Sequence, residues 1–349
     1  MNVSDFDYHL PGRLIAQTPA PRRDASRLMV LDRARKTIAH ARFSDIASLL
    51  NPGDLLVAND TRVIPARLYG TKKTGGRVEV FLLGATGNDG TGTVWECLLK
   101  SRRKVAVPST LSFTEALTGT ILERTGNDTW LVQFECAGDF FETLERAGRT
   151  PLPPYIRRGR DAADDTRDRA RYQTVYARKS GAVAAPTAGF HFTRELMDDV
   201  TGRGAAFAFV TLHIGYGTFQ PIRTETVEAH VMHKEYFQMP RDTARQVTRA
   251  IAEKRRIIAV GTTAARVLET CADPDGTTRD GEGVTDLYIY PGYAFKAVSG
   301  MITNFHLPRS SLLLLVSAFA GREFILEAYA EAVKHEYRFY SYGDAMLIV

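Results

Sequence analysis

The stretch GAVAAPTAGFHFT at residues 181–193, followed after a helix-like segment by FVTLHIGYGTFQP at residues 209–221, organises the rest of the chain. Each half is an apolar run joined to a turn of small residues, and each turn has a histidine within two residues, His191 and His213. Glycine lets a backbone approach a ligand closely, while threonine and histidine supply polar groups at short range. Two such turns predict one shared pocket, although either turn alone is equally well explained by ordinary turn chemistry and a hydrogen-bonded histidine.

Composition places the chain among ordinary globular proteins. It has 349 residues, 44% of them hydrophobic and 24% charged, which excludes collagen, coiled coil and disorder as global descriptions. A net charge of +5 permits a nucleic acid partner without requiring one. The three cysteines are scattered, which predicts a reducing compartment and no structural metal. No signal peptide is recognisable, and the most apolar run, residues 311–320, is half of the about 20 residues that cross a bilayer. We therefore expect a cytoplasmic protein with no membrane contact.

The periodicity of the sequence predicts two domains. From residue 62 to residue 135 apolar residues alternate in short runs separated by glycine-rich turns, which is typical of a small barrel. On either side, strands alternate with helices, as at residues 257–260 and 264–271. The predicted fold is therefore mixed α/β, with a larger discontinuous α/β domain over residues 1–66 and 150–349. A smaller β-barrel domain is inserted over residues 67–149.

Several local segments complete this prediction. Residues 54–58 form a buried strand ending in the polar tetrad Asn59-Asp60-Thr61-Arg62, which is either a ligand site or an Asx-turn. We expect another strand at residues 286–290, a surface loop at residues 273–283 and helices at residues 139–147, 242–255, 311–320 and 322–336.

Residues 149–179 are strongly basic, with nine Arg or Lys against four Asp and with tyrosines interleaved. Guanidinium groups pair with phosphates and aromatic rings stack on unpaired bases, so this composition suits RNA. A solvated, partly disordered loop is the alternative for residues 161–168.

The histidines His230 and His233 have a spacing seen in metal sites on helices, but no third ligand follows, so we predict no metal.

Seven phrases of the chain together resemble one enzyme family. They are LLVANDTRVIPARLYG, GAVAAPTAGFHFT, FVTLHIGYGTFQPI, HKEYF, AVGTTAARVLE, TNFHLPRSSLLLLVSAFAG and YRFYSYGDAM. Together they resemble the S-adenosylmethionine:tRNA ribosyltransferase-isomerases of queuosine biosynthesis, in consistent order from about residue 6 to residue 346. The β segment resembles the family less closely.

The resemblance implies a reaction. The ribosyl part of S-adenosylmethionine is transferred and isomerised onto 7-aminomethyl-7-deazaguanine at the tRNA wobble position, giving epoxyqueuosine in tRNA, adenine and methionine. S-adenosylmethionine is then a consumed substrate and no cofactor is needed. The partners are S-adenosylmethionine and a tRNA that carries the modified base in its anticodon loop, and we expect a monomer.

The chemistry indicates which residues the reaction needs. The sulfonium acidifies the protons on ribose C5′, so a base that works near neutral pH is required, and histidine meets that requirement. His191 or His213 is the expected base, with Asp60, Lys234 and Glu235 as the next candidates. The candidate substrate-binding residues are Asn59, Thr61, Arg62, Thr187, Gly189, Gly215, Gly217, Thr218, Gly261, Thr262, Thr263, Asn304, His306 and Tyr340. The candidate tRNA-binding residues are Arg157, Arg158 and Arg160.

Within the substrate-binding set, residues 261–263 open a helix after a strand. Their free amides could hold the methionyl carboxylate, although threonine capping accounts for the same residues. Two other functions remain open. A methyltransferase would produce S-adenosylhomocysteine and would normally have a glycine-rich turn after its first strand, which this chain lacks. A non-catalytic RNA-binding protein would consume nothing.

Overall fold

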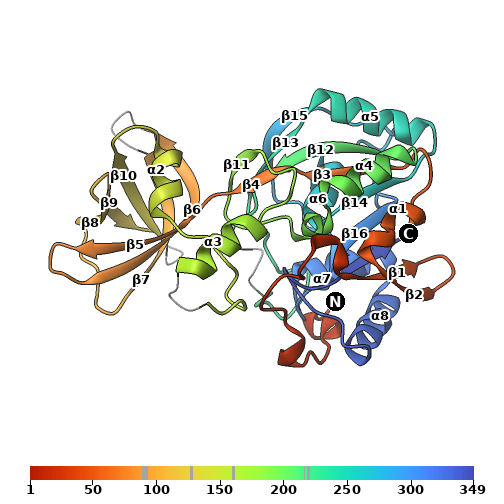
Figure 1. The fold of residues 1–349 in the computed structure, drawn as a ribbon, viewed down its shortest axis with the longest axis horizontal. Coiled ribbons are helices and arrows are strands. Elements are labelled where there is room, and N and C mark those ends of the chain that lie inside the picture. The colour runs from red at the N-terminus through yellow and green to blue at the C-terminus, as the bar shows by residue number, and fades with distance from the viewer. Residues whose placement is uncertain (89–92, 126–128, 159–161, 216, 218–220) are drawn as a thin grey trace.

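The computed structural model describes residues 1–88, 93–125, 129–158, 162–215, 217 and 221–349 (Figure 1). The chain forms a large mixed sheet covered by helices and, beside it, a closed barrel. The predicted mixed α/β fold with a barrel is therefore confirmed. The exact division at residues 66/67 and 149/150 stays a prediction.

The large sheet has nine strands. In spatial order they are β15 (Gly281–Thr285), β13 (Glu235–Met239), β12 (Ala206–Leu212), β3 (Leu55–Asn59), β14 (Ile257–Val260), β16 (Gly300–Asn304), β17 (Ala345–Ile348), β1 (Arg27–Asp32) and β2 (Thr37–Arg42). The four neighbours β12, β3, β14 and β16 are parallel, so their carboxyl ends share one edge of the sheet.

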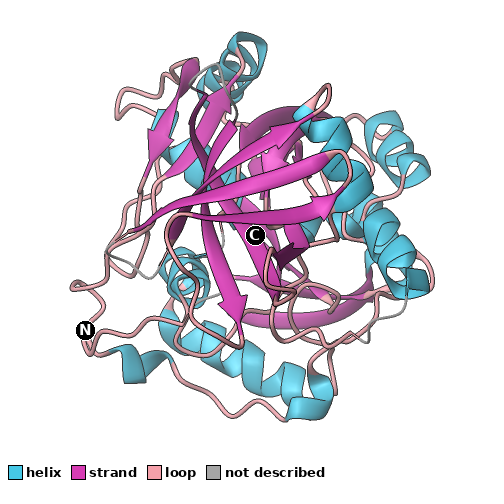
Figure 2. Ribbon diagram, turned by 90° about the vertical axis from the view of Figure 1, so that its left-hand side faces the viewer, coloured by secondary structure: helices cyan, strands magenta, loops and turns pink. Residues whose placement is uncertain are grey.

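Continuous apolar sequence explains why the central strands are buried on both faces. In β3, Leu55 and Val57 face one hydrophobic cluster, while Leu56 and Ala58 face another. The first cluster includes side chains of helices α5 (Arg241–Ala252), α6 (Thr262–Cys271), α7 (Ser311–Ala320) and α8 (Arg322–Lys334). The second includes side chains of α1 (Ile46–Leu49) and α4 (Arg194–Gly202). In Figure 2, which looks from the side of the barrel, helices lie outside the strands.

The barrel closes from six antiparallel strands. In spatial order they are β10 (Trp130–Cys136), β7 (Thr93–Ser101), β6 (Arg77–Asn88), β5 (Arg67–Lys72), β8 (Ser109–Thr114) and β9 (Leu117–Arg124). Helix α2 (Phe140–Ala147) follows; it begins at the N-cap Asp139, whose carboxylate accepts a hydrogen bond from the Glu142 amide at 2.9 Å. Phe140 and Leu144 of this helix pack into the barrel's own hydrophobic cluster.

The chain enters and leaves the barrel at one place. The backbones of Arg67 and Arg149 exchange two hydrogen bonds, at 3.2 and 2.8 Å. Beside them, a Cβ on Gly148 would lie 2.0 Å from the carbonyl oxygen of Pro65, so only glycine fits. The return segment leads to α3 (Ala162–Arg171), to β11 (Lys179–Ala182), which pairs with β4 (Thr61–Val63), and to the 3₁₀ turn η5 (Thr187–His191).

Some predicted elements are wrong. Residues 286–290 form no strand; the strand in this region is β15, which directly precedes them. The surface loop predicted for residues 273–283 therefore ends where β15 begins, at Gly281. The apolar residues 287–290 pack as side chains against the core, while the polar β15 pairs with β13 through its backbone. The disordered-loop alternative for residues 161–168 is also wrong for the described part, because α3 forms there and buries Asp168. Strands β1 and β2 were not predicted.

No helix in the described residues has the length and apolar character needed to span a membrane.

Candidate functional site

Polar side chains gather where the four parallel strands end. Asn59 ends β3, His213 follows β12, Gly261 follows β14, and Asn304 ends β16. Because parallel strands present their carboxyl ends at one edge, four segments distant in sequence meet there, as ligand sites do in open α/β sheets. The described parts of the two segments with which the sequence analysis began also lie side by side here, because the backbones of Ala184 and Ile214 are bridged.

Asn59 holds three of these segments in register. Its amide nitrogen donates to the Leu212 carbonyl at 3.0 Å and to the Thr263 hydroxyl at 3.2 Å. Its amide oxygen accepts from the backbone N–H groups of Thr61 and Leu212. The side-chain amide of Asn59 thus donates two hydrogen bonds and accepts two, all with protein groups. Asn59 therefore holds the backbone of the site in place.

A cavity of about 70 Å³ opens among these strand ends. Its walls include residues from three of the predicted turns and from the C-terminal segment: Thr187, Gly261, Thr262, Asn304, His306 and Tyr340. Gly261 has a φ of 94°, a conformation that glycine adopts without strain, and it lets the start of α6 face the cavity. The N-cap makes no side-chain hydrogen bond, so the first amides of this helix have no capping side chain.

His191 lies beside this cavity, but as a buried structural group. Its Nε2 accepts from the Asn304 amide at 3.2 Å, so its Nδ1–H is directed to the Ser26 hydroxyl at 2.7 Å. Burial, together with the nearby Arg23 charge, lowers the pKa of His191 to about 3. Both ring nitrogens are engaged, and the imidazole fixes Asn304, which also accepts from the Thr187 hydroxyl at 3.1 Å.

His213 has a different environment. Its Nδ1 lies 2.7 Å from the Thr61 hydroxyl, and its ring stacks on Tyr236 with centroids 5.4 Å apart. Among the described residues, its Nε2 has no hydrogen-bonding partner. Burial lowers the pKa of His213, and the Asp60 carboxylate partly opposes that shift. The ring is half-buried and packs against Gly181, where a Cβ would lie 2.7 Å from Nε2.

The two candidate carboxylates are each held by an arginine that the sequence analysis did not single out. Asp60 is buried and pairs with Arg178, Nε to Oδ2, at 2.5 Å, and it also accepts from the Thr211 hydroxyl at 2.6 Å. Glu235 is buried, pairs with Arg266 and accepts from the Gly215 amide at 2.9 Å. Lys234 is exposed. Arg266 stands within the quoted phrase AVGTTAARVLE, so the signal was present, but its partner lies 31 residues earlier.

Most of the remaining predicted substrate-binding residues make packing or hydrogen-bonding contacts within the protein. Gly189 approaches the Tyr176 hydroxyl and Gly217 approaches the His233 ring, each so closely that a Cβ would lie within 2.2 Å of it. His306 is buried, with Nε2 2.8 Å from the Thr303 hydroxyl. Thr218 lies outside the described residues. His230 and His233 precede β13 in an irregular segment instead of sharing a helix face.

Residues predicted to bind tRNA lie elsewhere, near a large groove. Arg157 is exposed, whereas the Arg158 guanidinium pairs with buried Asp168 through contacts of 2.6 and 3.0 Å. Arg160 lies outside the described residues. Arg62 is exposed and reaches Glu145 of α2 at 3.5 Å.

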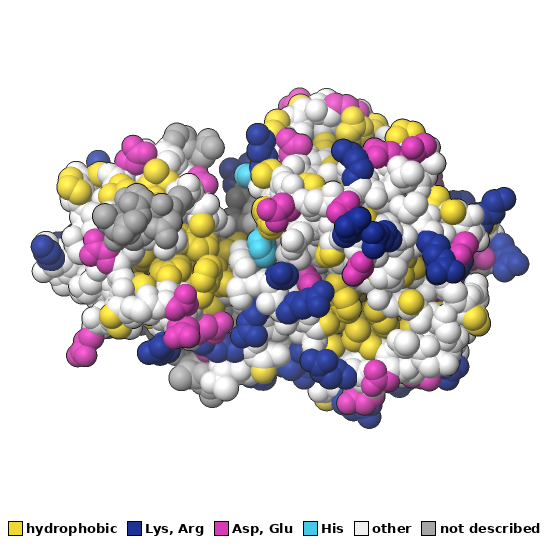
Figure 3. All heavy atoms as spheres, turned by 90° about the horizontal axis from the view of Figure 1, so that it is seen from above, with side chains coloured by type: hydrophobic (Ala, Val, Ile, Leu, Met, Phe, Trp, Pro, Cys, Tyr) yellow, Lys and Arg dark blue, Asp and Glu magenta, His cyan; other side chains and the backbone are white. Residues whose placement is uncertain are grey.

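The groove has a volume of about 800 Å³ and separates the barrel from the α3 segment. Its basic lining comprises Arg67, Arg77, Lys100, Arg102, Arg149 and Arg158. Its acidic residues Glu79, Asp165 and Asp168 each pair with an arginine. Tyr69 is 51% exposed in the groove, and its ring lies 5.5 Å from the Arg149 guanidinium. Figure 3 shows one face of the molecule, where lysine, arginine and histidine side chains border a hollow between barrel and core.

Fold and site together define the class: an α/β protein with a polar ligand site at its strand ends, an inserted barrel and a basic groove beside it. Comparisons with known proteins name that class more closely. The family model described as "Queuosine biosynthesis protein" matches residues 3–348. The chain therefore belongs to the queuosine biosynthesis family, and the resemblance seen in its sequence is confirmed.

Individual relatives agree along the full length. The chain is 51% identical over 349 residues to the S-adenosylmethionine:tRNA ribosyltransferase-isomerase of Trichlorobacter lovleyi, covering 100% of both chains. It is 52% identical over 351 residues to the protein of the same name from Geobacter metallireducens, again covering 100% of both. The crystal structure of S-adenosylmethionine tRNA ribosyltransferase from Thermotoga maritima is similar with a TM-score of 0.56 and 38% identity, over 99% of this chain and 100% of that one.

Proposed function

We propose that this chain transfers and isomerises the ribosyl part of S-adenosylmethionine onto 7-aminomethyl-7-deazaguanine at the wobble position of tRNA. The observation that carries the proposal is identity of 51% over 100% of a relative named for this activity. The products are epoxyqueuosine in tRNA, adenine and methionine. S-adenosylmethionine is consumed, no further cofactor takes part, and the chain works as a monomer.

His213 is the base in this proposal. Its Nδ1 is held by Thr61, its Nε2 is free of partners among the described residues, and its lowered pKa keeps the ring neutral near pH 7. A neutral imidazole can remove the C5′ proton that the adjacent sulfonium acidifies. Opening of the ribose then expels adenine, and the amine of the tRNA base attacks the resulting electrophile. The C5′–S bond breaks as the epoxide closes, which releases methionine.

The start of α6 binds the methionyl carboxylate. Gly261, Thr262 and Thr263 line the cavity, and although the Gly261 amide donates to the Ile302 carbonyl, the amides of Thr262 and Thr263 lie at the positive end of the helix dipole. The cavity of about 70 Å³ is smaller than the about 300 Å³ typical of small-molecule sites, so it holds only part of S-adenosylmethionine. The polar wall of the cavity fits the carboxylate end of S-adenosylmethionine.

The groove beside the barrel binds the anticodon stem-loop. Its surplus positive charge suits phosphates, and Tyr69 offers a face on which an unpaired base can stack. Unpaired loop bases can leave the stack without melting a duplex, which brings the modified base within reach of an enzyme pocket.

The test is to incubate the purified protein with S-adenosylmethionine and tRNA that carries 7-aminomethyl-7-deazaguanine, and to quantify adenine, methionine and S-adenosylhomocysteine. We expect adenine and methionine in equal amounts, only with the modified tRNA. Unmodified tRNA is the control. S-adenosylhomocysteine as the product would instead identify a methyltransferase, and tRNA binding without turnover would identify a binding protein.

A further inference from the structure

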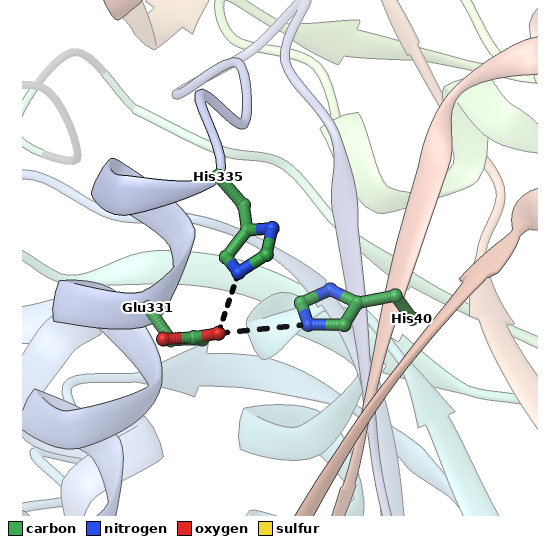
Figure 4. A group of neighbouring side chains, drawn as sticks. All are labelled: His40, Glu331 and His335. Carbon is green, nitrogen blue, oxygen red and sulfur yellow. Dashed lines mark ion pairs between the residues drawn. The ribbon is translucent and has the colours of Figure 1, made fainter.

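A second group of titratable side chains lies far from the strand-end site along the sheet. His40 is on the edge strand β2, Glu331 is in the last turn of α8, and His335 directly follows that helix (Figure 4). Their ligand atoms all lie within 4.8 Å of one another. Figure 4 shows both imidazoles turned toward the same carboxylate.

Glu331 Oε1 lies within ion-pair distance of both imidazoles. His335 Nε2 lies 2.7 Å from Glu331 Oε1, one helical turn away. His40 Nε2 lies 3.9 Å from the same oxygen, which is too far for a hydrogen bond. No other described residue accepts or donates at that nitrogen. The His40 ring packs on the His335 ring with centroids 4.8 Å apart, and its Nε2 is directed at the carboxylate without a hydrogen bond.

The separations suit a metal ion between the three groups. With zinc–ligand distances of about 2.0 to 2.2 Å in tetrahedral geometry, neighbouring ligand atoms are roughly 3.3 Å apart. The observed 2.7 and 3.9 Å lie on either side of that value, and all three ligand atoms lie within 4.8 Å of one another, so changes in separation of about 1.5 Å or less suffice. Two imidazole nitrogens and one carboxylate oxygen form a ligand set that zinc accepts, with water in the fourth position.

Tyr337 orients one of the ligands. Its hydroxyl lies 2.8 Å from His40 Nδ1, on the side of the ring opposite Glu331. When His40 donates Nδ1–H to this oxygen, the lone pair of Nε2 is presented toward Glu331. Such second-sphere contacts are typical of metal-binding histidines.

The nearby cations do not block the site. Lys334 approaches the other carboxylate oxygen, Oε2, at 3.4 Å and is largely exposed, which leaves Oε1 to the imidazoles. Arg27 donates to the His335 carbonyl at 2.7 Å, and its charge is balanced by Asp344 at 3.3 Å.

We propose that His40, Glu331 and His335 form a zinc-binding site that fastens the edge hairpin to the last helix. The site is independent of the ribosyl-transfer chemistry. Its ligands come from opposite ends of the chain, so bound metal would cross-link elements that separate on unfolding and would stabilise the folded state.

The test uses the full-length, untagged protein after EDTA treatment and dialysis, titrated with zinc sulfate by calorimetry and followed by thermal unfolding. We expect one saturable zinc per chain and a rise in Tm of about 3 °C at a hundredfold excess over Kd. His40→Ala and, separately, His335→Gln should each weaken zinc binding at least tenfold and reduce the rise in Tm at the same zinc concentration to about half or less. Tyr337→Phe should weaken binding about tenfold.

His9→Ala is the matched control, because His9 is exposed and lies outside the cluster. It should bind zinc as the unaltered protein does. Equal zinc affinity in the unaltered protein and in both ligand variants would mean adventitious binding, and would overturn the proposal. So would the absence of any saturable binding.

Discussion

Burial separates residues that look alike in the sequence. His191 and His213 stand in similar turns, and nothing in their spacing tells them apart. In the structure, His191 is 4% exposed with both nitrogens bonded, whereas His213 keeps one nitrogen free among the described residues. The same side chain is therefore a structural element in one turn and the best candidate for a base in the other.

His213 should set the acidic limb of the pH–rate profile. A base works only when deprotonated, so turnover should fall as pH drops through a pKa below the ordinary 6.5. His213→Ala should lower kcat by about 10² to 10⁴ and remove that limb. Adenine release measured from pH 5 to pH 8 checks this. A His191→Asn enzyme should retain the limb; if His213→Ala also retains it, the base is another residue.

Two buried histidines should make the fold sensitive to acid. Burial lowers the pKa of His191 and of His306 to about 3, while the unfolded chain binds these protons near 6.5. Between those values the unfolded state holds more protons, so acid favours unfolding. The free energy of unfolding should fall by up to about 1.4 kcal/mol per pH unit for each histidine.

Urea unfolding at pH 7, 6 and 5 measures this slope. The variant His306→Gln, which cannot take up a proton, should show a shallower slope than the unaltered protein. The same slope in both would show that His306 does not contribute.

Elements with strong local signals were predictable from the sequence, and elements defined by partners were not. Residues 54–58 and 257–260 are continuous apolar runs, so the buried strands β3 and β14 followed directly from them. The strand β15 is polar at most positions and exists because its backbone pairs with β13. An apolar run at residues 286–290 was mistaken for that strand. Hydrophobicity reports burial, and burial does not require a strand.

The same distinction applies to the site: residues with a local signal were predictable from the sequence, and residues whose role depends on a distant partner were not. Polar residues directly after buried strands were found because strand ends share an edge, which is a local argument. The arginines that neutralise Asp60 and Glu235 were missed, since each pairing joins segments that are distant in sequence. The α3 helix was missed for a similar reason: its buried Asp168 accepts hydrogen bonds from Arg158 and Tyr342, and Tyr342 is distant in sequence.

The start of helix α6 should govern affinity for S-adenosylmethionine. Thr262 lines the cavity, so Thr262→Val removes a hydroxyl from the carboxylate site while preserving shape. The apparent KM for S-adenosylmethionine should rise about three- to tenfold, the loss of one hydrogen bond, with that for tRNA unchanged.

Thr270→Val on the same helix is the control, because its hydroxyl bonds the Arg266 carbonyl and does not line the cavity. An unchanged KM in Thr262→Val would place the carboxylate elsewhere.

At the scale of the whole molecule, two cores enclose a charged groove. The barrel has its own hydrophobic cluster, distinct from the clusters of the large sheet. Because each part buries its own apolar surface, the boundary between them can remain polar and open. The groove occupies that boundary, and its paired acids leave an excess of cations toward a polyanionic ligand.

Binding of tRNA should therefore depend strongly on salt. Raising salt from about 50 to about 200 mM should weaken tRNA binding by two or more orders of magnitude, because binding releases condensed counterions. Binding of S-adenosylmethionine should barely change. Lys100→Gln with Arg102→Gln should lower the slope of log K against log salt by roughly 1 to 2.

Filter binding at four salt concentrations measures this slope. Arg245→Gln is the control, since Arg245 lies on α5 and does not line the groove. A double variant with the slope of the unaltered protein would exclude the groove as the tRNA path, without touching the assignment of the reaction.

The contact between the backbones of Arg67 and Arg149 has an evolutionary consequence. Both ends of the barrel segment leave the core at neighbouring points, joined by two hydrogen bonds. A segment whose ends lie together can be acquired, lengthened or exchanged without moving the structure that receives it. The α/β core and the barrel can then diversify at separate rates. The weaker family resemblance of this β segment is what such modular descent would produce.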